Sequence, residues 1–286
     1  MTEQAPLRLL SVHAHPDDEA SKGAALVARY VSEGIGATLV CCTGGELGEI
    51  LNPAMDRPEI VDNLAAVRLA ELETSAAAIG YDRIDLLGYR DSGMADMEEN
   101  TDLRNFANAP LDEAVGRLVE ILRRDRPQVI ITYSDDQGGY PHPDHLRTHE
   151  ISIVAFERSG DPAWYPDAGE PWRPSKLYYV VWSKARVLAT HHKMLEVGVE
   201  SPFSDEWLDR FDQDHRITTR VDIAQWWEAR DRALLAHATQ IDPASPFWFG
   251  LPPDVAATVY PWDEYILAAS HVPTDLPEHD LFAGLR

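Results

Sequence analysis

The chain has 286 residues, of which 44% are hydrophobic, and a chain of this length can bury roughly 75% of the surface that it exposes when unfolded. Its 48 acidic residues outnumber its 25 basic residues, which gives a formal net charge of −23. This charge disfavours nucleic acid and anionic membranes as partners, so we expect a neutral or small polar substrate.

The sequence suggests no targeting or membrane-spanning segment. The first twelve residues lack the basic start and the long apolar run of a signal peptide, and no stretch approaches the ~18 apolar residues of a membrane span. Cys41 and Cys42 are adjacent in an apolar run, where neighbouring side chains on a strand point to opposite faces and cannot easily form a bridge. We expect two buried reduced thiols in a cytoplasmic protein.

Short apolar runs alternate with helical patterns over the first 160 residues. In one of the helical patterns Leu111, Val115, Leu118 and Leu122 share a face. Strands that alternate with helices form a mostly parallel sheet with helices on both faces, so we predict a Rossmann-like α/β fold. The strands are predicted at 7–12, 37–43, 83–89 and 128–133, and the helices at 23–34, 60–80 and 111–124.

The remainder of the chain is less regular. A strand is predicted at 176–182, an amphipathic helix at 222–240 and an extended arm at 271–286. We expect residues 1–182 to form an α/β core and residues 183–286 to form a C-terminal extension that packs on this core, so that both belong to a single structural unit.

Polar or glycine-rich segments follow the first four predicted strands. In open α/β sheets, ligands bind at the carboxyl ends of the strands, so these segments are expected to converge on one rim. In chain order they are HAHPDDE, TGGELGE, YRDSG and SDDQGGYPHPDH.

Two HPD units, at 15–18 and 142–145, lie in these segments. A single unit would more often cap a helix than bind a metal, but a pair at two strand ends favours a metal site. Catalytic zinc takes three protein ligands, typically histidine and carboxylate, and keeps a fourth position open. We predict one divalent ion held by His15, Asp18 and His145. Zinc is the metal we expect, although such a ligand set also accepts ferrous iron.

Further titratable groups lie beside the predicted ion. Asp17 can take a proton from the attacking water, and His142 can stabilise the developing oxyanion or protonate the leaving group. Asp144 is placed to orient one of the histidines. His13 is expected to be a hydrogen-bonded structural histidine, because a third metal ligand is already available.

The segments AHPDDE and GGYPHPDH together resemble the LmbE-like, or PIG-L, family of zinc-dependent N-deacetylases, and the resemblance runs over nearly the whole chain. It implies zinc ligation by the three residues above, a base role for Asp17, an electrostatic or acid role for His142, and an approach of Tyr140 to the oxyanion. It also implies that Arg68 and Asp91 hold sugar hydroxyls, and that the C-terminal third helps to wall the pocket.

Other segments, including TGGELGEILNPAMD and AHATQIDP, resemble the branch of the family that hydrolyses mycothiol S-conjugates. That branch cleaves the amide of a small thiol-sugar conjugate and releases a mercapturic acid and glucosaminyl-inositol. Lys22 matches this branch, and it either contacts the peptide-like part of the conjugate or is a surface lysine. His237 and Gln240 match a shared segment, and we assign them no catalytic role.

Two alternatives remain open at this stage. A deacetylase acting on N-acetylglucosaminyl-inositol, or on a related amino sugar, would share the metal site and differ in the shape of its pocket. A metal-binding scaffold without catalysis would not need Asp17 and His142 beside three ligands, so the sequence favours an enzyme.

Overall fold

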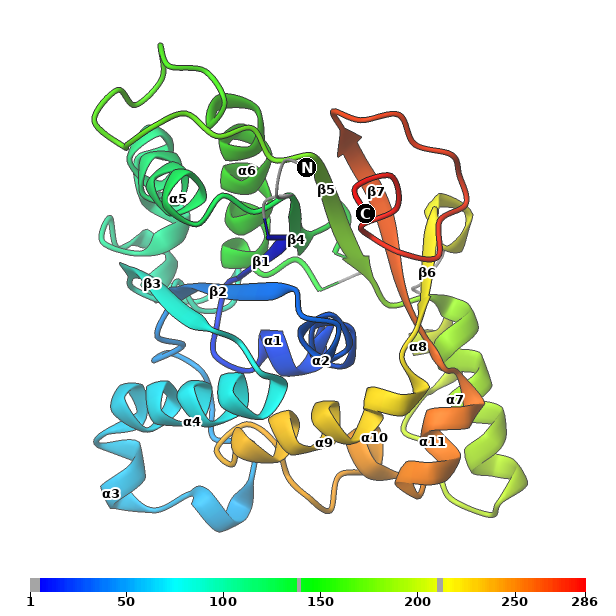
Figure 1. Ribbon diagram of the computed structural model, residues 1–286. Helices are drawn as coiled ribbons and strands as arrows, with labels where there is room; N and C mark the ends of the chain where they lie inside the picture. The colour runs from blue at the N-terminus through cyan, green and yellow to red at the C-terminus, as the bar shows by residue number, and fades with distance from the viewer. Residues whose placement is uncertain (1–5, 138–139, 210–212) are drawn as a thin grey trace.

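A single sheet organises the residues that the computed structural model describes, which are 6–137, 140–209 and 213–286. The order of its strands is β3-β2-β1-β4-β5-β7-β6 (Figure 1). Along the chain the strands are β1 (Arg8–His13), β2 (Gly36–Thr43), β3 (Arg83–Tyr89), β4 (Val129–Tyr133), β5 (Lys176–Val181), β6 (Thr219–Asp222) and β7 (Trp262–Ser270).

The strands β1 to β5 run parallel to one another. Leu10 in β1, for example, lies between Thr38 of β2 and Ile130 of β4. Among the described strands, β7 runs opposite to the rest of the sheet, since it pairs antiparallel with both β5 and β6. The predicted mostly parallel α/β fold is therefore confirmed, and the carboxyl ends of the first five strands meet at one edge.

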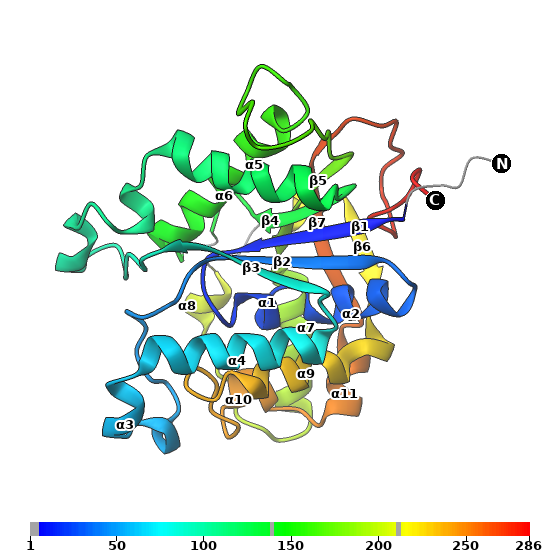
Figure 2. The ribbon, with the colours of Figure 1, turned by 60° about the vertical axis from the view of Figure 1, so that its left-hand side comes forward.

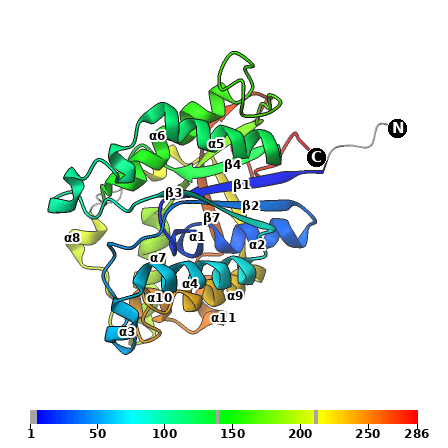
Figure 3. The same ribbon diagram turned by 90° about the vertical axis from the view of Figure 1, so that its left-hand side faces the viewer.

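Helices cover both faces of the sheet, as Figures 2 and 3 show. One face carries α2 (Ala24–Ser32), α4 (Leu64–Ile79) and α9 (Trp227–Ala236), and the other carries α5 (Leu111–Asp125) and α6 (Pro143–Arg158). The remaining α-helices are α1 (Asp18–Ser21), α3 (Pro58–Val61), α7 (Lys184–Glu196), α8 (Asp205–Leu208), α10 (Pro246–Phe249) and α11 (Pro253–Val259).

The central strands are buried on both faces, which explains why they read as continuous apolar runs. Leu9 of β1 packs in the cluster under α2 and α9, whereas Leu10 packs in the cluster under α5 and α6. Cys41 and Cys42 are buried and unbridged, as predicted, and they belong to different core clusters. In the described part of the chain, no helix is long and apolar enough to cross a membrane.

Two predicted helices have different boundaries in the structure. The helix predicted at 60–80 is divided into α3 and α4, and Asn63 is the N-cap residue of α4. Asp and Asn compete with helical hydrogen bonds and favour such end positions, which explains the break. The helix predicted at 222–240 is shorter, because Asp222 ends β6 and α9 covers only Trp227–Ala236.

The last sixteen residues form no helix or strand, as expected for an extended arm, but they are anchored to the core. Leu281 and Phe282 are fully buried in the core, and Glu278 forms a buried ion pair with Lys176 of β5 at 2.5 Å. The prediction missed this anchoring because the partner of Glu278 lies about a hundred residues away. Residues 183–286 thus contribute β6, β7 and a packed C-terminal segment to the same sheet.

Candidate active site

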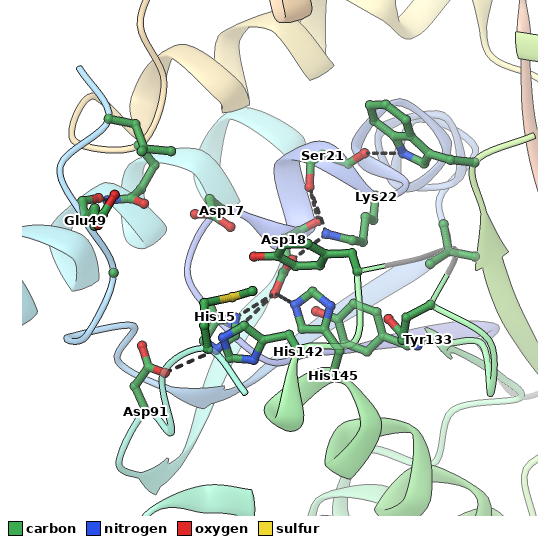
Figure 4. A pocket seen from close by; sticks show the side chains of 18 of the residues that line it. His15, Asp17, Asp18, Ser21, Lys22, Glu49, Asp91, Tyr133, His142 and His145 are labelled. Atoms are coloured by element: carbon green, nitrogen blue, oxygen red, sulfur yellow. Dashed lines mark hydrogen bonds and ion pairs between the residues drawn. The ribbon is translucent and has the colours of Figure 1, made fainter. Parts of the chain in front are cut away.

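The segments that follow the first four strands line one cavity of about 710 Å³ at the carboxyl edge of the sheet. Figure 4 shows the labelled side chains around Asp18, with Asp91 and Glu49 on one side and Ser21 and Lys22 on the other. Of the predicted site residues, all except Asp144 line this cavity: His15, Asp17, Asp18, Lys22, Arg68, Asp91, Tyr140, His142 and His145.

The three predicted metal ligands lie at distances that suit one ion. Asp18 Oδ2 is 3.4 Å from His15 Nδ1 and 3.4 Å from His145 Nε2. Ligand atoms about 2.0–2.2 Å from a tetrahedral ion are separated by roughly 3.3–3.6 Å. The donor types and their spacing therefore fit a divalent ion. A second group, His15 with Asp91 and His142, also has its donor atoms close together.

His15 is oriented from behind by two carboxylates. Its Nε2 is 3.2 Å from Asp144 Oδ2 and 3.6 Å from Asp91 Oδ1, which leaves Nδ1 facing Asp18. Burial lowers the pKa of His15, but hydrogen bonds to Asp144, Asp18 and Asp91 outweigh burial and raise that pKa well above its usual value. A carboxylate on the far nitrogen fixes the ring of a ligand histidine and increases its basicity.

Asp144 and Asp91 are both engaged by the protein itself. Asp144 is fully buried and accepts hydrogen bonds from the backbone and the hydroxyl of Ser92. Asp91 accepts hydrogen bonds from the backbone of Gly93 and Leu47 at 2.8 and 3.2 Å. The position of Asp144 suits the orienting role expected for it. Asp91 lines the cavity, and its contact with sugar hydroxyls remains a prediction.

Asp17 is held in an unusual backbone conformation beside the predicted ligands. Its φ of 108° lies outside the regions that non-glycine residues ordinarily adopt, and such strain is common at functional sites. Arg68 Nη2 donates to Asp17 Oδ2 at 2.9 Å and to the Pro16 carbonyl at 2.6 Å. Burial raises the pKa of Asp17, and Arg68 opposes this effect without cancelling it.

Arg68 is buried on α4 and is not a solvated helix charge. Besides Asp17 and Pro16, its guanidinium donates to the carbonyl of Gly45. A Cβ atom at Gly45 would lie 2.5 Å from this guanidinium, and the φ of Gly45 is +64°, so a side chain there would displace Arg68 and strain the backbone. These contacts place the guanidinium of Arg68 against the carboxylate of Asp17, while its contact with a sugar remains a prediction.

His142 and Tyr140 lie on the side of the cavity formed by α6. His142 is the N-cap residue of α6 and accepts a hydrogen bond from Asp144 N on Nδ1 at 3.2 Å. Burial, followed by the nearby charge of His15, lowers the pKa of His142. The neutral ring therefore carries its proton on Nε2 and can donate it. The ring of Tyr140 is half exposed and lies 5.6 Å from the ring of His145.

Lys22 is not a surface lysine. Its side chain lines the cavity and is 23% exposed, and its Nζ lies 2.5 Å from Asp18 Oδ1 and above the ring of Tyr133. Because Asp18 Oδ2 faces the two histidines, Lys22 neutralises the other oxygen of the same carboxylate. This position is compatible with contact to an acyl group bound next to Asp18.

His13 differs from the sequence expectation. It is buried as expected, but among the described residues neither of its ring nitrogens has a hydrogen-bond partner. The ring instead packs edge-on against Tyr133, and burial lowers the pKa of His13 to about 4. A neutral ring in an aromatic contact needs no ionic partner, so the predicted hydrogen-bonded histidine is wrong in this respect.

A buried network that was not predicted from the sequence joins Asp17 to the C-terminal extension. Glu19 accepts hydrogen bonds from the backbone of Asp17 at 3.0 Å, from Ser75 at 2.5 Å and from His237 Nε2 at 2.5 Å. Glu19 and His237 are fully buried. The available signals were the third acid of HPDDE and the histidine of HATQ, which only the fold brings together.

We expect His237→Ala to lower the free energy of unfolding by about 3–5 kcal/mol, because it leaves Glu19 buried without its cationic partner. Denaturation in urea would measure the loss. The matched control is His192→Ala, since His192 is exposed on α7 and its replacement should change stability by less than about 0.5 kcal/mol. Equal stability of the two variants would show that the contact between Glu19 and His237 does not stabilise the fold.

Comparisons with known proteins show the family of this chain. The family model described as GlcNAc-PI de-N-acetylase (PIG-L) matches residues 10–156. The mycothiol S-conjugate amidase of Streptomyces coelicolor is 47% identical, over 100% of this chain and 99% of that protein. The 1D-myo-inositol 2-acetamido-2-deoxy-alpha-D-glucopyranoside deacetylase of Geodermatophilus obscurus is 40% identical, over 97% of this chain and 98% of its own length.

A solved structure supports the fold. The N,N'-diacetylchitobiose deacetylase of Pyrococcus horikoshii superimposes with a TM-score of 0.64 at 19% identity, over 92% of this chain and 84% of that chain. At this identity the likeness extends to the arrangement of strands and helices alone.

Proposed function

This chain belongs to the PIG-L family, and from that premise we propose that it is a metal-dependent amidase that hydrolyses mycothiol S-conjugates to a mercapturic acid and glucosaminyl-inositol. Two observations support a hydrolase of the amidase or deacetylase type: the chain belongs to this family, and its amidase and deacetylase relatives match nearly its whole length. The choice of a conjugate as substrate goes further and needs its own argument.

The observation that carries this choice is the extent of the cavity on both sides of the ligand group. Glu49 and Asp91 lie on one side, where a polar sugar would bind, and Lys22 lies on the other side, where the acyl group would bind (Figure 4). Beyond Lys22 the cavity continues along Trp182 and Phe247. An acetyl group would need room for a methyl group only, whereas a cysteinyl group with a sulfur substituent would fill this space.

The side chains suit the hydrolysis of an amide. A divalent ion held by His15, Asp18 and His145 would polarise the amide carbonyl and make the attacking water more acidic. Asp17 accepts a proton from that water, and Arg68 keeps its carboxylate in place. His142 donates from Nε2 to the oxygen that gains negative charge, and Tyr140 approaches the same oxygen. The C–N bond breaks as the amine nitrogen receives a proton, which Asp17 can return or His142 can supply.

Zinc is the proposed metal, because two histidines, one carboxylate and an open position form a typical catalytic zinc site. The same donors accept ferrous iron, so iron is the alternative.

The second candidate function is deacetylation of N-acetylglucosaminyl-inositol. The deacetylase relatives that match nearly the whole chain favour it.

A side-by-side assay separates the two activities. We expect the protein to release the mercapturic acid from a fluorescent mycothiol S-conjugate faster than it releases acetate from N-acetylglucosaminyl-inositol, and we expect a chelator to stop both reactions. Faster release of acetate would assign the protein to the deacetylases. Turnover of the conjugate that a chelator does not affect would exclude the proposed metal dependence.

A further inference from the structure

The cavity has an aromatic wall on the side of Lys22. We use this name for four side chains that line the cavity: Trp182, Trp207, Phe247 and Trp248. Trp182 follows β5, Trp207 lies on α8, and the other two lie on α10. All four are partly exposed, so each presents an apolar surface to the space. The C-terminal extension supplies three of them, and only Trp182 belongs to the core region.

The aromatic wall is built as a unit around Phe247. The ring of Phe247 stacks on Trp182 with centroids 5.7 Å apart, and it packs edge-on against Trp248 at 4.7 Å and Trp207 at 6.2 Å. Phe203 supports the unit from the buried side. Rings packed in this way form a mainly apolar surface that binds apolar and aromatic groups.

The aromatic wall is attached to the catalytic side of the cavity. Trp182 Nε1 donates to the carbonyl of Ser21 at 3.3 Å, and Ser21 directly precedes Lys22. Lys22 in turn contacts Asp18. An acyl group bound at Asp18 would therefore pass Lys22 and continue toward Trp182, while the sugar on the other side of the amide would lie toward Asp91.

We propose that the aromatic wall is the subsite for the sulfur substituent of the conjugate, and that it makes the enzyme select aromatic and apolar substituents over small or anionic ones. This inference rests on the proposed amidase function. The preference follows because an apolar group gains by leaving water for this surface, whereas a carboxylate would lose its hydration against four aromatic rings.

A second cavity of about 80 Å³ lies directly behind the aromatic wall. It is lined by Trp182, Phe247 and Trp248 from one side and by Val187 and Met194 of α7 from the other. At these three rings the aromatic wall is one side chain thick, and its back is incompletely packed. Because Met194 is a flexible side chain, the rings have room to shift and admit substituents of different size.

The test compares three mycothiol conjugates that differ only at sulfur: S-(1-naphthylmethyl), S-methyl and S-carboxymethyl. For the unmodified protein we expect kcat/KM to be about tenfold higher for the naphthylmethyl conjugate than for the other two. Phe247→Ala should remove most of this preference, measured as the ratio of the kcat/KM values for the naphthylmethyl and S-methyl conjugates. Phe247→Leu, which keeps an apolar side chain and disturbs folding less, should reduce the preference in the same direction.

The matched control is Trp164→Ala. Trp164 is an exposed aromatic residue that stacks on Arg158 and does not line the cavity, so this variant should keep the full preference. Equal kcat/KM values for the three conjugates in the unmodified protein would overturn the subsite and leave the amidase function intact. If both Phe247 variants keep the full preference, the subsite is likewise overturned and the amidase function is unaffected.

Failure of the proposed function gives a different result. If the protein releases acetate from N-acetylglucosaminyl-inositol and cleaves no conjugate, the amidase function is wrong. The subsite is then tested by inhibition of the deacetylation. Stronger inhibition by N-acetyl-S-(1-naphthylmethyl)cysteine than by N-acetyl-S-methylcysteine, weakened by Phe247→Ala, would support the aromatic subsite. Equal inhibition by the two compounds would overturn it.

Discussion

Asp17→Asn is expected to reduce kcat by about 10²–10⁴-fold, the usual contribution of a general base. The amide keeps the size of the carboxylate and can still accept a hydrogen bond from Arg68, which donates to Asp17 at 2.9 Å. It cannot take a proton from water at neutral pH. Since Asp17 is not one of the three predicted ligands, the variant should bind metal in the same amount as the unmodified protein. Steady-state assays and metal analysis on the same samples would measure both properties.

The matched control for this prediction is Asp62→Asn. Asp62 is exposed between α3 and α4, outside the cavity, so its replacement should leave kcat unchanged. Unchanged turnover in Asp17→Asn would refute the base role. Loss of bound metal in that variant would instead place Asp17 among the ligands, and the reduced turnover would then have a different cause.

Local patterns predicted the parallel half of the fold well. The strands 7–12, 37–43 and 128–133 were recognisable because buried parallel strands are short, mainly apolar runs. The strand 83–89 lies at the edge of the sheet and is largely exposed, and its place between a helix and a loop marked it. The rule that ligands bind at the carboxyl ends then indicated where the HPD units would meet. The structure brings His15 and His145 together across more than a hundred residues, with both 3.4 Å from Asp18.

The antiparallel part could not be predicted in the same way. β7 (Trp262–Ser270) buries two acids, Asp263 and Glu264, so only the run YILAA in its second half has the continuous apolar pattern of a buried strand. Its position between β5 and β6 depends on pairing with strands about 90 and 40 residues away. Such pairing is a property of the assembled sheet and leaves little trace in the strand itself.

Arg68 and Glu19 show the same limit for the site. In the sequence, Arg68 looks like an ordinary solvated charge on a helix. Only the fold shows that it is buried, because the loop at Gly45 packs against its guanidinium. Glu19 follows the two acids of the motif and would pass for a helix-start residue. Its role depends on His237, which is more than two hundred residues away. Contacts of this kind follow from packing, and no local spacing predicts them.

The aromatic wall was also beyond prediction from sequence. Trp182, Trp207 and Phe247 lie in three segments that have no common motif, and each would be expected to be an ordinary core residue. In the structure these rings meet at one side of the cavity, because β5 ends there and the extension returns to the same edge. The likeness to the family directs attention to the metal ligands, whereas only the packing of the extension brings these rings to the wall of the cavity.

Removal of a metal ligand should have an effect at least as large as removal of the base. We expect Asp18→Ala to lose tightly bound metal and to reduce kcat by roughly 10³-fold or more, because polarisation of the carbonyl and activation of water depend on the ion. Asp144→Asn should weaken metal binding without abolishing it. It weakens the carboxylate that holds His15 at 3.2 Å, and such changes typically lower metal affinity about 10–100-fold.

Titration with a competing chelator would measure both affinities, and Asp62→Asn again serves as the control. Full turnover in Asp18→Ala would exclude this carboxylate as a ligand and would favour the second group, His15 with Asp91 and His142.

The identity of the metal is tested on the unmodified protein, which is stripped of metal with a chelator and then restored anaerobically with zinc or ferrous iron. Recovery with zinc is the expected result, because the structure offers three nitrogen and oxygen donors at tetrahedral spacing. Recovery with iron alone would keep the ligands and the base and would replace only the metal.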